Sequence, residues 1–212
     1  MNGPFVESAG SVGQLSNTAE RSDEELFRLF RMGNASAFDL LVHRYEGELF
    51  GYLNRYLRSR ELAEDTFQNT FMAVYQKADN FEEGKKFRPW LYAIATNQAI
   101  DASRKRKRRV AISLEGETNN GANNKVGSIK DSLEGRDQKP DSFAMLDEKK
   151  LRVRQAIDML PENLRQVLLL AYFHEFKYQE ISEVLDIPLG TVKSRLHAAM
   201  EKFQQSWKEM QE

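Results

Sequence analysis

The chain has 212 residues, of which 41% are hydrophobic and 30% are charged, and its formal net charge is -1. This size suits one or two modest globular domains, and no apolar run reaches the ~18 residues of a membrane span. A net charge this close to zero excludes a protein that coats nucleic acid through bulk positive charge, so any DNA binding must come from local basic clusters. The chain has no cysteine, which excludes disulfides and thiolate zinc sites and fits a reducing cytoplasm.

The first segment, residues 1–21, is rich in Gly, Ser, Asn and Thr, so we expect a disordered tail. It lacks the basic patch and apolar core of a secretory signal. A helix is predicted to begin at Ser22, because Glu25 stands three residues later and the two can form a capping box.

Residues 22–112 are predicted to form an all-helical domain, since no alternating strand pattern competes with the helical one. A second helical run covers about 61–77, a loop follows at 78–88, and Pro89 suits the first turn of the next helix. That helix ends in the basic run 104–109. The apolar residues that set the early helical period are Leu26, Leu29, Phe30, Phe38, Leu41, Tyr45, Leu49, Leu53 and Tyr56.

Residues 113–141 are rich in Gly, Asn and Ser and have no sustained apolar period, which indicates a flexible linker. A second helical domain is predicted over 142–212. The expected fold class is therefore all-α, with two small helical domains joined by the linker.

The end of the chain has the pattern of a helix-turn-helix. Asp186 stands where a left-handed turn residue is wanted, and Pro188 prevents the first helix from continuing. Ile181 and Leu185 mark the inner face of the first helix. The buried stripe of the second helix follows helical spacing and consists of Val192, Leu196, Ala199 and Phe203.

The other face of this last helix carries hydroxyl and cationic side chains near its start. Such side chains suit contacts with base edges and phosphates in a major groove. The alternative is an ordinary amphipathic hairpin with a solvated polar face, but spacing and chemistry together favour the helix-turn-helix. The candidate DNA-binding residues are Thr191, Lys193, Ser194, Arg195 and His197.

The segment ISEVLDIPLGTVKSRL resembles the promoter-reading helix-turn-helix of the sigma-70 family, in its extracytoplasmic-function (ECF) group. Three N-terminal segments resemble the same group: AFDLLVHRYEGELFGYL, AEDTFQNTFMAVYQKADNF and RPWLYAIATNQAIDASRKRKRR. The resemblance covers about 22–109 and 143–205. It implies an alternative sigma factor, not an enzyme, that binds core RNA polymerase, directs it to specific promoters and promotes DNA melting, without a cofactor or metal.

The resemblance also implies the partners and the first set of site residues. The partners are promoter DNA and, on core polymerase, the clamp helices of the largest subunit and the flap region; whether an anti-sigma factor binds too stays open. Asp65 and Gln68 share one helix face, because they are three residues apart. Asn69 stands where many relatives have an acid, so we expect no salt bridge there. With Phe71, these form the expected polymerase-binding set, and the alternative is a solvated polar face.

The loop at 78–88 and the helix after it resemble the part of a sigma factor that captures unpaired bases of the −10 element. An unpaired base needs an apolar or aromatic wall, amide hydrogen bonds and cations for its phosphate. Trp90 stays open between a core anchor and a stacking platform. The run 104–109 surrounds its helix, so only some of its cations can reach DNA, and a solvated helix end is the alternative. The candidate set is Asn80, Phe81, Lys85, Lys86, Arg88, Trp90, Asn97, Arg104 and Arg106.

The length of the linker limits how the two domains can reach two promoter elements at once. About 30 residues reach roughly 100 Å when extended but average about 30 Å as a coil, whereas promoter elements two helical turns apart are some 70 Å distant. Polymerase must then hold the domains apart, and the free factor should recognise promoters poorly. The competing class is a conventional helix-turn-helix regulator that binds duplex DNA alone. An enzyme is disfavoured, because His43, His174 and His197 form no metal-spaced pair and no phosphate-binding loop is present.

Overall fold

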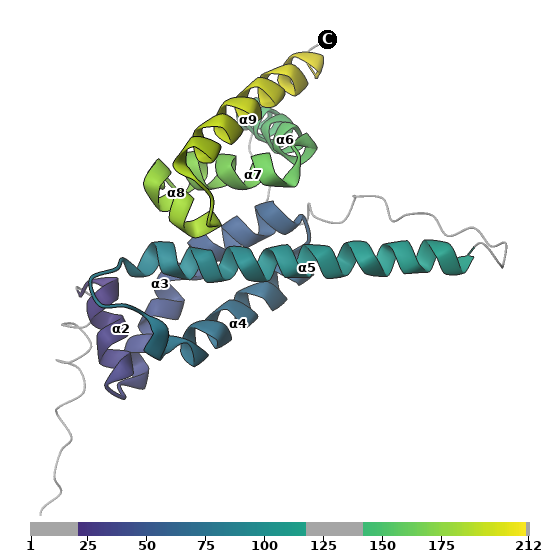
Figure 1. Ribbon diagram of the computed structural model, residues 1–212. Coiled ribbons are helices and arrows are strands. Elements are labelled where there is room, and N and C mark those ends of the chain that lie inside the picture. The colour runs from purple at the N-terminus through teal and green to yellow at the C-terminus, as the bar shows by residue number, and fades with distance from the viewer. Residues whose placement is uncertain (1–20, 118–141, 211–212) are drawn as a thin grey trace, which may run out of the picture.

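The computed structural model describes residues 21–117 and 142–210, and within these ranges it contains helices and no strand (Figure 1). The all-α prediction is confirmed. The expected N-terminal tail and most of the expected linker lie outside the described residues.

The N-terminal domain consists of α2 (Asp23–Arg31), α3 (Ala35–Leu57), α4 (Arg60–Gln76), a short 3₁₀ turn (Ala78–Asn80) and α5 (Phe87–Glu117). The predicted capping box starts α2: Ser22 Oγ accepts from the Glu25 backbone N–H at 3.2 Å, and the Glu25 carboxylate accepts from the Ser22 N–H at 3.0 Å. At the centre of the domain, the hydroxyl groups of Tyr52 on α3 and Thr96 on α5 lie 2.8 Å apart and are buried.

Helix α5 continues past residue 112, where we expected the linker to begin, and reaches Glu117. Arg, Lys, Ala, Leu and Glu are strong helix formers, and neither Gly nor Pro occurs between Arg104 and Glu115. Gly116 stands at the end of the helix. The basic run therefore lies inside a long helix and not in its last turn.

The C-terminal domain consists of α6 (Ser142–Met159), α7 (Glu162–Leu168), a π-helical turn (Leu169–Phe173), α8 (Tyr178–Leu185) and α9 (Leu189–Glu209). Asp186 ends α8 in the left-handed region, with φ 49° and ψ 52°, and Pro188 caps α9. Val192 and Ala199 are fully buried. The structure confirms the predicted turn residues and the buried stripe of Val192, Leu196 and Ala199, whereas Phe203 is only partly buried.

The two domains pack against each other, with α8 of the C-terminal domain lying over α5 (Figure 1). Buried apolar residues of the two domains form one continuous cluster. At the boundary, the ring of Tyr92 on α5 meets the ring of Phe176 edge-on, with centroids 4.8 Å apart. Helix α5 of the N-terminal domain is thus the packing surface for α8 of the C-terminal domain.

Candidate nucleic-acid and polymerase interfaces

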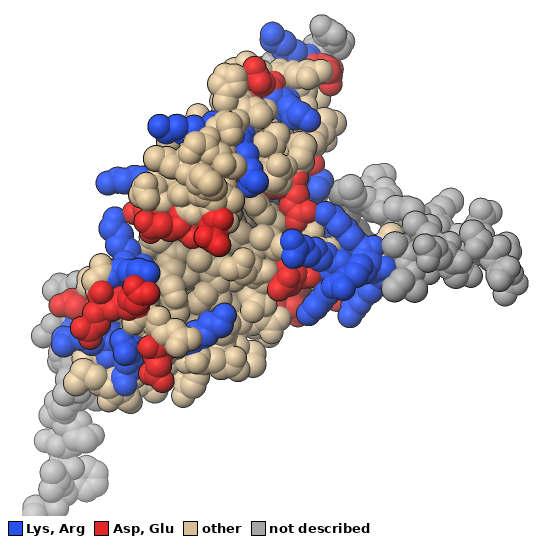
Figure 2. Space-filling model, viewed as in Figure 1, with Lys and Arg blue, Asp and Glu red and all other residues tan. Residues whose placement is uncertain are grey.

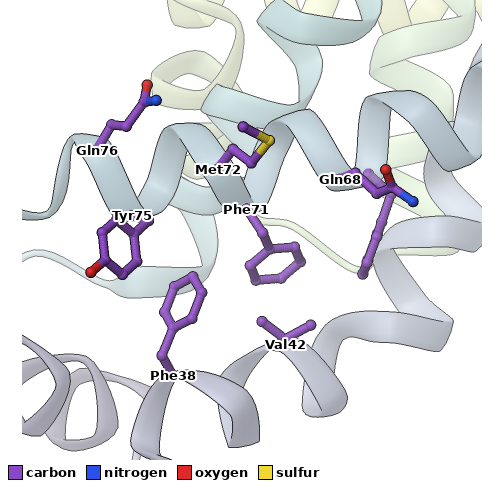
Figure 3. Close-up of a pocket in the computed structure, with 8 residues that line it drawn as sticks. Phe38, Val42, Gln68, Phe71, Met72, Tyr75 and Gln76 are labelled. Atoms are coloured by element: carbon purple, nitrogen blue, oxygen red, sulfur yellow. The ribbon is translucent and has the colours of Figure 1, made fainter. Parts of the chain in front are cut away.

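An open apolar groove of about 520 Å³ lies between α3 and α4. Figure 3 shows Phe38 and Val42 of α3 facing Phe71 and Tyr75 of α4 across it. The side chain of Phe71 is only 6% exposed, whereas Met72 and Tyr75 are 59% and 61% exposed. We call this set the α4 groove; its lining residues are Phe38, Val42, Phe67, Gln68, Phe71, Met72, Tyr75 and Gln76.

Two of the four expected polymerase-binding residues, Gln68 and Phe71, line this groove. Asp65, Gln68 and Asn69 are exposed on α4, and Gln68 is part of the groove lining. Phe71 is buried beside Phe67, with ring centroids 5.0 Å apart, so it shapes the groove more than it presents a surface.

Sequence reasoning missed Met72 and Tyr75, although a signal for them existed. Both are large apolar residues that α4 leaves outside its set of buried residues, which are Ala63, Thr66, Thr70, Phe71, Ala73 and Val74. Contiguous exposed apolar surface on a soluble helix indicates a contact site.

The loop between α4 and α5 is held in place by α2. The Glu24 carboxylate accepts from the Phe87 backbone N–H at 2.9 Å and so caps the start of α5. Arg31 donates to the carbonyl of Phe81 at 3.4 Å. Gly84 has a φ of +85°, a conformation that favours glycine. Together these contacts leave Asn80, Lys85 and Lys86 exposed along the loop.

Phe81 does not have the position that we expected. Its ring is 7% exposed and packs against Phe27 at 5.2 Å and Trp90 at 5.1 Å between centroids. An aromatic residue between two helices gains more from joining this cluster than from facing water. The ring is therefore unavailable to an unpaired base, and the half-buried Trp90 is an anchor of the same cluster.

The basic side chains of α5 differ in the protein groups that they contact. Arg104 lies 3.9 Å from Asp101, and Arg106 donates to the Leu57 carbonyl at 3.3 Å. Both are exposed, as is Asn97, and Figure 2 shows Lys and Arg gathered over the outer part of α5. These groups form a basic surface on one side of the N-terminal domain.

Arg88 is the exception among the predicted −10 cations. Its guanidinium binds the carboxylate of Glu48 and donates to the backbone carbonyl of His174 at 2.7 Å. The same group lies over the ring of Phe176, 4.3 Å from its centroid. In this arrangement Arg88 serves the contact between domains and not a phosphate.

On α9 the predicted promoter-reading side chains lie outside the buried stripe of Val192, Leu196 and Ala199. Lys193, Ser194 and His197 are exposed, while Thr191 and Arg195 are partly so. The Ser194 hydroxyl donates to the carbonyl of Thr191 at 3.1 Å. The structure thus brings all five together near the start of one helix, as major-groove contacts require.

A polar cluster at the domain boundary escaped sequence reasoning, because each member taken alone resembles an ordinary surface residue. Glu48 Oε1 accepts from the Tyr92 hydroxyl at 2.9 Å and lies 3.3 Å from His174 Nδ1. Hydrogen bonding by His174, followed by that of Arg88 and Tyr92, outweighs burial and lowers the pKa of Glu48 to about 2. Glu48 is therefore a carboxylate that both domains help to hold in its charged form.

Neither a metal site nor a membrane-spanning helix is found in the part of the chain that the structure describes. Within residues 21–117 and 142–210, no three His, Asp or Glu side chains converge as metal ligands would. None of the helices in these ranges has the length and apolarity needed to cross a bilayer.

Comparison with known proteins places both domains. Residues 41–109 match the family model for Sigma-70 region 2, and residues 150–203 match that for Sigma-70, region 4. The RNA polymerase sigma-H factor of Pseudomonas aeruginosa is 32% identical over 191 residues, covering 86% of this chain and 92% of that protein. The ECF RNA polymerase sigma factor SigW of Bacillus subtilis is 31% identical over 180 residues, covering 85% and 94%.

Solved structures agree with this placement. The sigma factor RpoE of Bartonella quintana, solved in complex with the anti-sigma factor NepR, has a TM-score of 0.58 and 27% identity, with 80% of this chain and 93% of that chain covered. CnrH, solved in complex with the cytosolic domain of CnrY, shares the fold, with a TM-score of 0.61, 20% identity and coverage of 87% and 96%. With both sigma-70 regions present in order and full-length relatives above 30% identity, this chain belongs to the ECF group of the sigma-70 family of RNA polymerase sigma factors.

Proposed function

We propose that this sigma factor docks on core polymerase through the α4 groove and its polar border. The observation that carries the proposal is an apolar groove lined by Gln68, Met72 and Tyr75, of which Met72 and Tyr75 are largely exposed at 59% and 61%. Asp65 and Asn69 are exposed on the same helix. A helix of the partner can bury these apolar groups while its polar side chains meet the border. The expected partner is the pair of clamp helices of the polymerase largest subunit.

Promoter contacts are divided between the two domains in this proposal. Asn80, Lys85 and Lys86 on the loop, with Asn97, Arg104 and Arg106 on α5, take the unpaired −10 strand, while Arg88 joins them when the domains separate. Thr191, Lys193, Ser194, Arg195 and His197 on α9 recognise the −35 duplex. Strand separation is then driven by binding, because captured bases cannot re-pair, and no nucleotide hydrolysis is needed. The flap region of polymerase holds the C-terminal domain at the −35 element, and the site of action is the cytoplasm.

An anti-sigma factor is a further proposed partner. The relative RpoE, at 27% identity, was solved in complex with the anti-sigma factor NepR. A protein of this class would compete with polymerase for surfaces such as the α4 groove.

The docking site is tested by co-purification with core polymerase. Asp65→Ala/Gln68→Ala and Met72→Ala/Tyr75→Ala should each lower the fraction of sigma factor that co-elutes with core. The control, His43→Ala/Glu46→Ala, removes a pair on α3 that is 85% and 67% exposed, and such pairs contribute little to stability. Undiminished association of both α4 variants, with circular dichroism like that of the wild type, would place the docking site elsewhere.

A further inference from the structure

Helix α2 contacts the loop between α4 and α5 on both sides of its turn. The match to Sigma-70 region 2 begins at residue 41, so α2 (Asp23–Arg31) lies outside it. Before the turn, Arg31 Nη1 donates to the carbonyl of Phe81 at 3.4 Å. After the turn, Glu24 Oε1 accepts from the backbone N–H of Phe87 at 2.9 Å. One helix therefore fixes the loop backbone at two points.

Helix α2 is itself fixed to the body of the domain. The carboxylate of Asp23 binds the guanidinium of Arg44 and the hydroxyl of Tyr45, both on α3. Phe27 is fully buried, and its ring packs against that of Phe81 at 5.2 Å between centroids. Because α2 is held by ionic contacts at its start and by a buried ring in its middle, it is a firm support for the loop.

Each contact from α2 acts on the neighbour of a proposed DNA-binding side chain. Asn80 precedes Phe81 and Lys86 precedes Phe87, and both Asn80 and Lys86 are exposed. The chain between them turns at Gly84, whose φ is +85°. Fixing the backbone on both sides of this turn sets the direction in which the exposed side chains point. A loop ordered in advance also loses less conformational entropy when it binds.

We propose that α2 is a brace for this loop, and that Glu24 and Arg31 are positioning residues for the capture of the unpaired −10 strand. Neither side chain contacts DNA; each holds the backbone next to a residue that does. This inference rests on the proposed function of the loop. The sign of the effect is specific to a brace. Glu24 is an anion beside a surface that binds an anion, so removing it would strengthen binding through charge alone, whereas loss of the brace weakens binding.

The test uses holoenzyme formed from core polymerase and the full chain, with single-stranded oligonucleotides that the wild type selects from a pool randomised over the −10 element. Glu24→Ala should lower affinity about five- to tenfold, because a hydrogen bond to a charged group is lost. Glu24→Gln should bind nearly as the wild type does, since its amide oxygen can still accept from the Phe87 N–H.

Glu25→Ala is the matched control for the charge of Glu24. It removes the same charge one residue along the helix, where the carboxylate accepts from the Ser22 N–H at 3.0 Å and not from the loop. Its affinity for the oligonucleotide should be equal to that of the wild type or slightly higher. If Glu24→Ala binds as well as Glu25→Ala does, Glu24 has no positioning role and the brace is wrong.

Salt dependence separates Arg31 from a direct phosphate contact, which contributes about 0.7 to the slope of log affinity against log salt on a single strand. Arg31→Ala should lower affinity and leave this slope unchanged. Its loss should overlap with that of Asn80→Ala but add to that of Arg104→Ala, about 25 Å further along α5. A shallower slope, or a loss that adds fully to that of Asn80→Ala, would overturn the role of Arg31.

Trp90 reports the position of the loop directly. Its ring packs against that of Phe81 at 5.1 Å between centroids, and the chain has two tryptophans, so Trp207→Phe leaves Trp90 alone. In that background, Glu24→Ala/Arg31→Ala should make Trp90 fluorescence easier to quench with acrylamide, with unchanged helicity and core binding. Unchanged quenching would show that α2 does not hold the loop. Wild-type holoenzyme that selects no sequence from the pool would instead refute the proposed function of the loop, so the two failures are distinguishable.

Discussion

At the scale of single residues, burial decides which predicted contacts are available. Asn80 and Phe81 are neighbours in the loop after α4, yet Asn80 is exposed and Phe81 is 7% exposed within an aromatic cluster. A sequence shows that an aromatic residue and an amide occur together in a loop, but not which of them faces water. Both were equally good candidates for base capture until the positions of Phe27 and Trp90 were known.

Replacing these two residues singly should therefore give opposite results. Phe81→Ala should lower the free energy of unfolding by about 3–5 kcal/mol, because it removes a buried ring and leaves a cavity. Asn80→Ala should be nearly neutral for stability and should weaken −10 oligonucleotide binding. Chemical denaturation of both variants checks the first effect and fluorescence anisotropy the second. A stable Phe81→Ala protein with weakened DNA binding would show instead that this ring contacts DNA.

At the scale of single helices and turns, the predictions that the structure confirms are those that depend on residues close together in the sequence. The Ser22–Glu25 capping box, the left-handed Asp186 and the stripe through Val192 and Ala199 depend on residues a few positions apart, and the structure confirms each. The reach of α5 was underestimated, because composition alone does not show where a run of strong helix formers stops. The α4 groove needed a second helix, α3, so no pattern within α4 could define it.

Helix α9 supports a prediction about how the −35 element is recognised. Arg195→Ala should change sequence preference as well as affinity, because an arginine that reaches a guanine edge contributes about 1–3 kcal/mol of discrimination. The matched control is Lys202→Ala, an exposed cation further along the same helix. Polymerase holoenzyme formed with each variant is assayed on a library of −35 sequences. A uniform loss across the library for Arg195→Ala would mean that this side chain contacts phosphate only.

At the scale of the whole molecule, the contact between domains joins residues far apart in the chain. Glu48 and His174 are 126 positions apart, and Tyr56 and Glu162 are 106 apart. No local pattern links such residues, and each side chain resembles a solvated polar group when considered alone. Sequence reasoning considered only the length of the linker between the domains, and so did not predict this contact.

The carboxylates at this contact make domain packing sensitive to acid. His174, Arg88 and Tyr92 lower the pKa of Glu48 to about 2 from 4.5, against burial. Burial also opposes the shifts of the other two, but hydrogen bonds from Lys107 and Tyr56 lower the pKa of Glu162, and those from Lys86 and the Lys177 backbone lower that of Glu180. In each case a partner from the other domain favours the charged form.

The direction of the pH effect follows from these lowered pKa values. A group whose pKa is depressed in the packed state stabilises that state above its ordinary pKa and loses this contribution as pH falls through the depressed value. Packing should therefore be complete near neutral pH and should weaken from about pH 4.5 toward about 2, the window given by Glu48. Arg88, His174, Tyr92 and the more distant Tyr45 are the charged or titratable groups that face Glu48.

Fluorescence energy transfer between dyes on Glu83→Cys and Gln179→Cys, exposed positions beside the Lys86–Glu180 bridge, reports this opening. Transfer should fall on acidification before helicity measured by circular dichroism is lost, since the ionic bridges join domains that each retain their own helices and core. In a Glu48→Gln background transfer should start lower at neutral pH and change less through the window, because the amide cannot ionise and binds Arg88 less strongly. If transfer and helicity fall together in the parent protein, acid unfolds the domains and does not merely separate them. If the Glu48→Gln protein follows the parent curve, the titrating carboxylates lie elsewhere at the contact, with Glu162 and Glu180 as the next to replace.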